Sequence, residues 1–374
     1  MLSHLRRQFR FIFVYTFGVD RDHGRGAVSN PSGRFERFTR EPVDDTDAYA
    51  PDDDPAPPLA TTVTPEKTRN IIARNDSPDV GFDRSINPYK GCEHGCVYCF
   101  ARPTHSFLGL SPGLDFETKI FSKPEAARLL REALAKPGYR ADVLVVGANT
   151  DAYQPVEREL KITRSVLEVL QAHRHPVSII TKSSLVVRDV DILSEMAKDN
   201  LASVNHSITT LDRTLARTME PRAATPERRL AAMKTLADAG VPVGVLASPM
   251  IPALNDSELE RILEASAAAG AQWANYILVR LPHELKQLFV EWLNRHYPAR
   301  AEHVLSILRD MRGGRLYDPR FGERMRGQGP YAELLKTRFT VACRRLRLNQ
   351  ADRALDTSKF RVPARRGAQR PLFS

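Results

Sequence analysis

Three of the four cysteines lie in one short stretch, INPYKGCEHGCVYCFARPTH. Cys92, Cys96 and Cys99 follow the spacing Cys-x3-Cys-x2-Cys, and Gly91 and Gly95 allow the backbone to turn tightly between them. Thiolates are soft ligands, which zinc, copper(I) and iron–sulfur clusters prefer. The residue types and their spacing therefore predict a metal centre on this loop.

A zinc site of three cysteines with His94 or His105 is the competing interpretation. Such sites usually draw ligands from two separated knuckles, and no second knuckle is found in this sequence, so the pattern favours iron and sulfur. We expect both histidines to stabilise the loop rather than to bind metal. Cys343 lies far along the chain in TRFTVACRRL, where a small buried apolar role is favoured and a hydrogen-donor role is the alternative.

The composition limits the class of protein. The chain has 374 residues, of which 42% are hydrophobic, and this is enough for one large core. No apolar run approaches the ~18 residues that a membrane span needs. The stretch FIFVYTF near the N-terminus is too short for a signal peptide and has no cleavage site after it. We therefore expect a cytoplasmic protein without a membrane partner, in which four cysteines do not form a disulfide framework.

The net charge of +10 is unevenly distributed. Residues 41–54 are acidic, whereas the sequence from Arg309 onward is crowded with arginine. A basic C-terminal region can attract the phosphates of a nucleic acid. A solvated arginine-rich surface is the alternative, and the sequence leaves both open.

Apolar runs rich in β-branched residues alternate with amphipathic helical stretches along the middle of the chain. The expected strands lie near residues 85–90, 142–150, 176–183, 202–211, 241–251 and 273–282. The expected helices between them lie at residues 124–135, 161–174 and 227–240, the last ending at Gly240. Buried strands separated by helices indicate βαβ units and a parallel sheet.

Six such units are too few for a closed eight-fold barrel. The pattern predicts an α/β protein with a partial (βα)6 TIM-type barrel, and a doubly wound sheet is the alternative. The predicted parts are a mostly irregular, flexible N-terminal arm (1–80), the barrel (81–295), a C-terminal helical extension (296–350) and a loose basic tail (351–374).

Polar residues gather where the expected strands end, which is the catalytic edge in either arrangement. They include Asn149, Thr150, Asp151, Thr181, Lys182, Ser183, Ser207, Thr209, Thr210 and Arg280. The segment after the fourth strand is also strongly polar. We expect ion pairs there rather than substrate contacts for Arg213, Arg217, Glu220 and Arg222.

The cysteine spacing, with Tyr98 before the third cysteine, resembles the signature of the radical S-adenosylmethionine (SAM) superfamily. The resemblance covers about residues 85 to 295. Within the superfamily the chain is similar to the branch related to spore photoproduct lyase, a bacterial subgroup of mostly unassigned substrate. The segments that carry this resemblance are INPYKGCEHGCVYCFARPTH, TDAYQPVE, SITTLD and GVLASPMIPALND.

The resemblance implies a [4Fe–4S] cluster on Cys92, Cys96 and Cys99, with SAM on the iron that lacks a cysteine. Reductive cleavage of SAM would then give a 5′-deoxyadenosyl radical, which attacks an unknown substrate such as a nucleic acid or a protein. A ferredoxin or flavodoxin is the implied reductant. The donor cysteine that spore photoproduct lyase is expected to carry soon after its cluster loop has no counterpart here, which puts thymine-dimer repair in doubt.

The resemblance also assigns residues to SAM. Tyr98 would contact the adenine, Lys182 the carboxylate and Ser207 the ribose hydroxyls. The family's glycine-glycine-glutamate stretch is replaced here by residues 147–151, so the amino group would fall to Asn149, Thr150 or Asp151. Arg280 would hold the SAM carboxylate or an anionic substrate.

Two other classes of function compete with this interpretation. One is a zinc-stabilised nucleic-acid-binding module without catalysis, which would use the basic C-terminal region. The other is an electron-transfer protein that only houses a cluster. Iron and sulfide analysis separates the first from an enzyme, and formation of 5′-deoxyadenosine separates the second.

Overall fold

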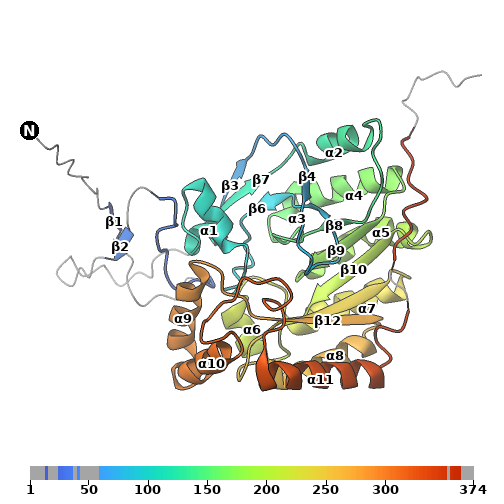
Figure 1. Cartoon of the computed structure of the whole chain (residues 1–374). Helices are drawn as coiled ribbons and strands as arrows, with labels where there is room; N and C mark the ends of the chain where they lie inside the picture. The colour runs from blue at the N-terminus through green and yellow to red at the C-terminus, as the bar shows by residue number, and fades with distance from the viewer. Residues whose placement is uncertain (1–12, 16–23, 37–39, 43–58, 352–353, 364–374) are drawn as a thin grey trace, which may run out of the picture.

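The computed structural model describes residues 13–15, 24–36, 40–42, 59–351 and 354–363 (Figure 1). Its main feature is a seven-stranded sheet in the order β12-β11-β10-β9-β8-β5-β4. The six strands from β5 to β12 are parallel, and the edge strand β4 (Ile72–Arg74) is antiparallel to β5. The parallel strands are β5 (Arg84–Ile86), β8 (Leu144–Val146), β9 (Val177–Thr181), β10 (Ala202–Ser207), β11 (Val243–Met250) and β12 (Trp273–Leu278).

The strand order confirms the predicted partial barrel. From β5 to β12 the spatial order follows the chain order, whereas a doubly wound sheet reverses direction at a switch point. Within the described residues the two edge strands, β4 and β12, are not paired with each other, so the barrel is open. The carboxyl ends of all six parallel strands consequently share one edge.

Helices cover the outer face of the curved sheet (Figure 1). They follow the strands along the chain, and Thr225 caps the start of α7 through a side-chain bond to the N–H of Arg228. Gly240 lies just past the end of this helix with φ +81°, as predicted. The outer helices are α2 (Ala126–Leu134), α4 (Ile162–Ala172), α5 (Val190–Ala197), α7 (Pro226–Asp238), α8 (Leu259–Ala268) and α11 (Gly329–Arg345).

Alternate strand residues explain this arrangement. Ile179, Val204 and Val245 are fully buried in the core that the outer helices share. The opposite face of the same strands carries polar side chains, such as Asn205, whose amide donates to Ser178 Oγ at 3.0 Å. The sheet therefore has an apolar outer face and a partly polar inner face, which is typical of a barrel that encloses a site.

A second, three-stranded sheet supports the loop that carries the cysteines. It has the order β3-β7-β6, with β3 (Thr62–Pro65), β6 (Tyr89–Lys90) and β7 (Lys119–Ser122). The sequence patterns did not predict it, and β3 and β4 both lie within the range that we expected to be mostly irregular. Short helices flank the loop and the strand ends: η1 (Arg102–Leu108), α1 (Leu114–Thr118), α3 (Glu157–Leu160), η2 (Ser184–Asp189), α6 (Arg213–Met219) and η3 (Asp256–Glu258).

Three helices lie in the C-terminal part of the chain. They are α10 (Pro298–Asp310) and α11, preceded by α9 (Leu285–His296). Side chains of α9 and α10 form a second core with the cysteine loop, to which Val97 and Trp292 contribute with no exposed surface. These helices thus support the predicted metal site directly.

The described part of the predicted arm includes a short parallel pair of strands, β1 (Phe13–Tyr15) and β2 (Arg40–Pro42). Other parts of the arm and of the tail lie outside the described residues. This holds for most of residues 1–58 and for 352–353 and 364–374. In the part of the chain that is described, no helix has the length and apolar character that crossing a membrane requires.

Candidate functional site

The three clustered cysteines lie between β6 and η1, at the carboxyl edge of the parallel sheet. Cys92 and Cys96 are buried, Cys99 is half-buried, and none is in a disulfide. Gly91 and Gly95 have φ of +76° and +68°, and a side chain on Gly95 would collide with the carboxylate of Glu117. The loop therefore needs both glycines, as the sequence suggested.

A buried ion pair fixes one side of this loop. The guanidinium of Arg102 donates to the carbonyls of Cys96 at 2.8 Å and Gly95 at 3.0 Å, and to Glu117 at 2.5 Å. Glu117 in turn accepts the backbone N–H groups of Gly26 and Ala27 at 2.9 and 2.8 Å. Neither Arg102 nor Glu117 has exposed surface. The pair thus ties the cysteine loop to α1 and to an N-terminal segment.

Polar side chains hold the other side of the loop. The N–H of Glu93 donates to Gln154 at 2.9 Å, and Gln154 donates to the carbonyl of Gly91 at 3.2 Å. The Glu93 carboxylate accepts from Arg222 at 3.1 Å, and the Arg222 N–H bonds the carbonyl of His94 at 3.3 Å. Arg222 therefore makes an ion pair, as expected for the polar segment. Arg213 does so with Glu227 at 2.7 Å.

Asp151 connects the loop to the ends of β8 and β9. Its carboxylate accepts the N–H of Lys182 at 2.7 Å and the hydroxyl of Thr181 at 2.8 Å, and lies 3.3 Å from His94 Nδ1. Burial alone would raise the pKa of this carboxyl, but the paired imidazole and the backbone N–H groups of Lys182 and Tyr153 lower it well below its usual range. Asp151 is therefore an anion that the surrounding groups already bind.

Tyr98 and Lys182, two of the candidates for SAM binding, lie close together. The Lys182 ammonium lies 5.7 Å from the centre of the Tyr98 ring. The Tyr98 hydroxyl donates to the buried carboxylate of Glu220, which also accepts from Thr209 at 2.6 Å and from Arg229. The sequence pointed to Tyr98, Lys182 and Thr209, but it did not predict that Arg229 donates to Glu220.

The remaining candidates at the strand ends differ in whether their side chains already have hydrogen-bond partners within the protein. Thr150 is buried and donates to the carbonyl of Tyr89 at 2.8 Å, and Ser207 donates to the carbonyl of Ser248 at 3.0 Å. The backbone of Asn149 bonds Asn87, and its side chain is half-exposed at this edge. Of the three candidates on residues 149–151, Asn149 has the most available side chain.

Arg280 follows β12 on the Cys99 side of the loop. Its guanidinium lies 4.7 Å from the centre of the Phe100 ring. Burial lowers its pKa, and the nearby guanidinium of Arg324 acts in the same direction. Structure thus places Lys182 and Arg280, the two cationic candidates, beside different parts of the loop: Tyr98 for the first and Phe100 for the second.

Two histidines and the fourth cysteine are the remaining candidates. His105 bonds the carbonyl of Lys119 at 3.0 Å and stacks edge-on against Phe116, and His94 pairs with Asp151, so both are held by protein groups within the loop region. Cys343 is buried in the main core on α11, where Asn349 approaches its sulfur at 3.8 Å. Burial raises the pKa of the Cys343 thiol to about 11.

The donor set of the loop fits an iron–sulfur cluster in its chemistry. Within the described residues no three His, Cys, Asp or Glu side chains lie as close together as a single bound ion requires. The three cysteines nevertheless influence one another: burial raises the pKa of Cys92, and the charges of Asp151, Cys96 and Cys99 raise it further. A cationic inorganic group would reverse that penalty, because it favours the thiolate form.

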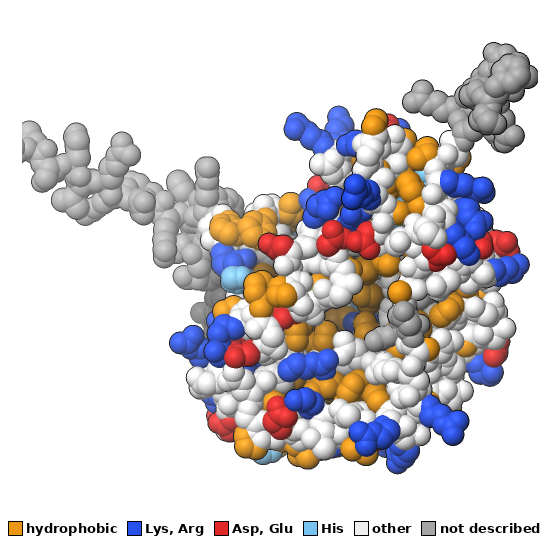
Figure 2. Space-filling view, turned by 45° about the vertical axis from the view of Figure 1, so that its right-hand side comes forward, with side chains coloured by type: hydrophobic (Ala, Val, Ile, Leu, Met, Phe, Trp, Pro, Cys, Tyr) orange, Lys and Arg blue, Asp and Glu red, His pale blue; other side chains and the backbone are white. Residues whose placement is uncertain are grey.

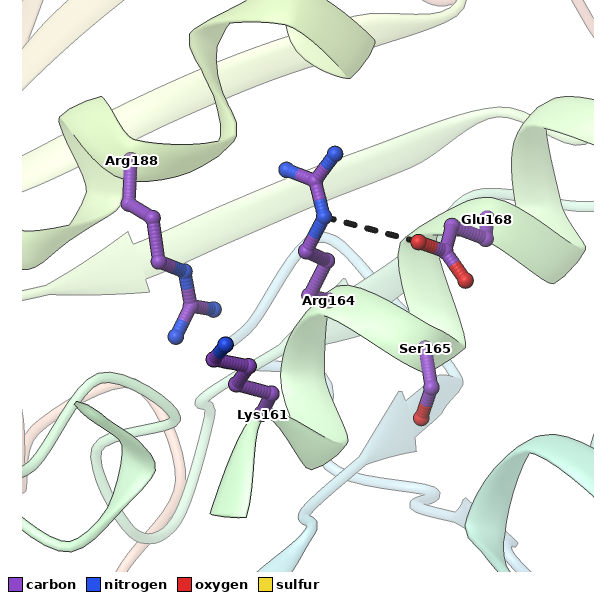
Figure 3. A pocket seen from close by; sticks show the side chains of 5 residues that line it. All are labelled: Lys161, Arg164, Ser165, Glu168 and Arg188. Atoms are coloured by element: carbon purple, nitrogen blue, oxygen red, sulfur yellow. Dashed lines mark ion pairs between the residues drawn. The ribbon is translucent and has the colours of Figure 1, made fainter. Parts of the chain in front are cut away.

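A pocket lies between the start of α4 and η2 (Figure 3). Lys161, Arg164 and Arg188 line it together with Ser165 and Glu168. Both arginines are engaged by the buried carboxylate of Asp189, at 2.9 Å from Arg164 and 2.8 Å from Arg188. The pocket is therefore a by-product of ion pairs that support the strand-end loops.

Some arginines of the C-terminal region are ion-paired where it is described. Arg338 pairs with Glu260 at 2.6 Å, and Arg320 pairs with Asp318 at 2.5 Å. Figure 2 shows Lys and Arg side chains scattered over the visible face and interleaved with acidic ones, around a hollow lined by hydrophobic side chains. The arrangement on this face is that of a mixed charged surface.

Residues 86–265 match the sequence profile of the Radical SAM superfamily. An uncharacterized protein of Mycobacterium tuberculosis is 35% identical over 248 residues, which is 66% of this chain and 72% of the relative. An uncharacterized protein of Methanocaldococcus jannaschii is 28% identical over 219 residues, covering 59% of this chain and 78% of the relative. The profile match thus includes the cysteine loop and the parallel strands β8 to β11.

Among solved structures the fold is similar to spore photoproduct lyase. The structure complexed with dinucleoside spore photoproduct has a TM-score of 0.55 and 16% identity, covering 76% of this chain and 79% of that one. A mutant with bound AdoMet and the same dinucleoside has a TM-score of 0.52 and 17% identity, covering 76% and 78%. At this level of identity the likeness concerns the fold.

Proposed function

The chain belongs to the radical SAM superfamily, and from that premise we propose that it is an enzyme that reductively cleaves SAM at a [4Fe–4S] cluster held by Cys92, Cys96 and Cys99. When bound, the cluster supplies the electron that splits SAM into methionine and a 5′-deoxyadenosyl radical, which removes hydrogen from a substrate carbon. The observation that carries the proposal is the clamped three-cysteine loop at the carboxyl edge of the sheet, with Cys343 far away in the core.

The chain's own residues would bind and orient SAM. Tyr98, fixed by Glu220, offers its ring to the adenine, and Lys182 beside it offers a cation to the carboxylate. Asn149 is the best available partner for the amino group, because the oxygens of Thr150 and Asp151 already have protein partners. Ser207 could bond the ribose only by giving up the Ser248 carbonyl.

Asp151 supports the site without touching SAM in this proposal. Its carboxylate holds the backbone of Lys182 and the ring of His94, and so fixes the position of Lys182 relative to the cysteine loop. The buried surroundings of Cys92 and Cys96 would exclude water from the cluster side. The protein thus contributes orientation and exclusion, while the cofactors carry the bond cleavage.

We propose two classes of partner. Enzymes of this superfamily generally need a reductant, and a ferredoxin or flavodoxin is the class we propose. A nucleic acid is the proposed macromolecular substrate, supported by the basic C-terminal region. Such binding must weaken steeply with salt, because counterions are released from the phosphates. Binding that does not change between low and high salt would remove nucleic acid as the substrate class.

Anaerobic purification tests the function. The wild-type chain should carry iron and sulfide, and should form 5′-deoxyadenosine from SAM when reduced with dithionite. Cys96→Ala should lose both the cluster and SAM cleavage, whereas Cys343→Ala, the matched control at the fourth cysteine, should keep both. Zinc without iron in oxygen-free preparations would contradict the proposal.

A further inference from the structure

Arg280 is a guanidinium next to the cysteine loop with no acidic partner. Within the described part of the chain it makes no ion pair and no hydrogen bond, and its contact is with the face of Phe100 at 4.7 Å. Phe100 directly follows Cys99, and 43% of its surface is exposed. The pair therefore lies at the accessible margin of the proposed cluster site.

Asp79, whose charge acts on Arg280, and Asp318, whose charge acts on Arg312, are both committed to other groups. Asp79 accepts from Arg324 and from the N–H of Gly322 at 2.6 Å. Asp318 pairs with Arg320 at 2.5 Å. The positive charge of Arg280 is thus left without a direct counter-ion.

Two further guanidiniums interact with this charge, and one of them, Arg324, is already paired with Asp79. Arg324 and Arg312 both interact electrostatically with Arg280. Arg312 is buried and bonds only backbone carbonyls, those of Val279 at 2.7 Å and Arg324 at 3.3 Å. Carbonyl oxygens are neutral, so Arg312 brings a positive charge that no ion pair among the described residues neutralises, although the charge of Asp318 acts on it. A multiply charged anion is better suited to such a group than a single carboxylate is.

The geometry of Arg280 is favourable for an oxyanion. A guanidinium offers five donors in a planar fork, and here none is used by a described protein acceptor. The Phe100 ring beneath it restrains the plane of that fork. Two parallel N–H bonds to a phosphate would use the fork and offset the cost of leaving a half-buried charge unpaired.

We propose that Arg280, resting on Phe100, binds a phosphate group of the substrate beside Cys99. The inference rests on the proposed function only in placing a substrate at this edge of the sheet. It assigns the SAM carboxylate to Lys182, which lies beside Tyr98, and reserves Arg280 for the substrate. The phosphate can belong to a small phosphorylated molecule or to a nucleic-acid strand.

Isothermal titration of the anaerobic holoprotein tests this assignment. The probes are inorganic phosphate, a ten-nucleotide oligothymidylate and SAM, each titrated into wild type, Arg280→Gln, Arg280→Lys and Arg315→Gln. Arg315 is an exposed arginine in the connection between α10 and α11, which also contains Arg312 and Arg324. Its variant therefore removes one positive charge from the nearby surface. Arg280→Lys keeps the charge and removes the planar fork.

We expect Arg280→Gln to weaken phosphate binding by about tenfold or more and to leave SAM binding within about twofold. Arg280→Lys should recover part of the loss, and Arg315→Gln should change neither probe by more than about twofold. An oligonucleotide that loses affinity in parallel with phosphate points to a nucleic-acid strand, and one that is not bound points to a small molecule.

Two results would overturn the assignment. In the first, Arg280→Gln weakens SAM and leaves phosphate unchanged, which would make Arg280 part of the SAM site. In the second, phosphate binding is the same in all four proteins. The phosphate titration contains no SAM, and it can be repeated on protein that carries no cluster. Failure of the proposed function would therefore leave phosphate binding at Arg280 intact, whereas failure of the phosphate site would not.

Discussion

The guanidinium of Arg102 lies 2.5 Å from the carboxylate of Glu117, and neither side chain has any exposed surface. Arg102 is the first residue of η1, and Glu117 lies in α1. Together they bind the backbone of the cysteine loop and of an N-terminal segment. A buried charge pair of this kind is retained only if each partner is satisfied. Its position suggests that the loop's shape depends on it.

Removing one partner should therefore harm both stability and cluster loading. Glu117→Gln leaves the Arg102 charge buried without a counter-ion, which typically costs about 3–5 kcal/mol. We expect a lower free energy of unfolding in urea and less iron per chain. Arg128→Ala, which removes an exposed arginine paired with Glu125 and Glu132, is the control and should change stability by about 0.5 kcal/mol or less. Full iron content in Glu117→Gln would show that the loop holds its shape without the pair.

Glu220 is predicted to position Tyr98 for SAM. Its carboxylate joins the Tyr98 hydroxyl, Thr209 and Arg229 in a buried network. Glu220→Gln keeps the size of the side chain but removes the charge that Arg229 needs, so the network should rearrange and the Tyr98 ring should shift. We expect about five- to tenfold weaker SAM binding with the iron content retained.

The measurements for this variant are SAM titration and the change in the cluster's EPR spectrum on adding SAM. A structural role alone would lower the unfolding free energy without altering that spectral change. Glu227→Gln, which removes the exposed partner of Arg213, is the matched control. Unchanged SAM affinity in folded Glu220→Gln would refute the positioning role.

The sequence predicted the sheet well because its strands are buried on the helix side. Buried apolar residues recur at every second position within the strands, as Val177 and Ile179 do in β9 and Val243 and Val245 do in β11. The helices between the strands end at recognisable residues such as Gly240. The cysteine loop was equally easy to recognise, since its three cysteines lie within eight residues. Local patterns were enough for both.

The residues that hold the cysteine loop in place could not be predicted, because they are distant from one another in the sequence. Glu117 bonds Gly26 and Ala27, about 90 residues away, and no local pattern links them. The strand-end polar residues were predicted as a group, but not which of their atoms are already occupied. Thr150 bonds Tyr89, and Asp151 bonds Lys182 and Thr181, because the chain must satisfy its own buried polar groups before it can bind a ligand.

Cys343 should behave as a packing residue. Cys343→Ala removes a buried sulfur from the main core, which should lower the unfolding free energy by about 1 kcal/mol and leave iron content and SAM cleavage unchanged. Cys343→Ser should cost more, because it places a hydroxyl in an apolar site. Urea unfolding and iron analysis check both variants. Loss of substrate turnover with intact SAM cleavage would instead revive the hydrogen-donor role.

His206 should make stability depend on pH. The imidazole on β10 is fully buried, and neither ring nitrogen has a hydrogen-bond partner within the described residues. Burial lowers its pKa to about 4, from the ordinary value of 6.5, and the charge of Arg229 acts in the same direction. The unfolded chain therefore binds a proton more readily than the folded one between these two values.

The stability contributed by neutral His206 is accordingly full above about pH 6.5 and is lost as the pH falls toward 4. His206→Leu removes this proton, so its unfolding free energy should fall less steeply with decreasing pH, by up to about 1.4 kcal/mol per pH unit in this window. His105 and His175, whose pKa values burial also lowers to about 4, should keep a residual slope. Urea unfolding at several pH values measures both slopes, with the exposed His303→Leu as control. Equal slopes in wild type and His206→Leu would mean that this imidazole is solvated or protonated in the folded protein.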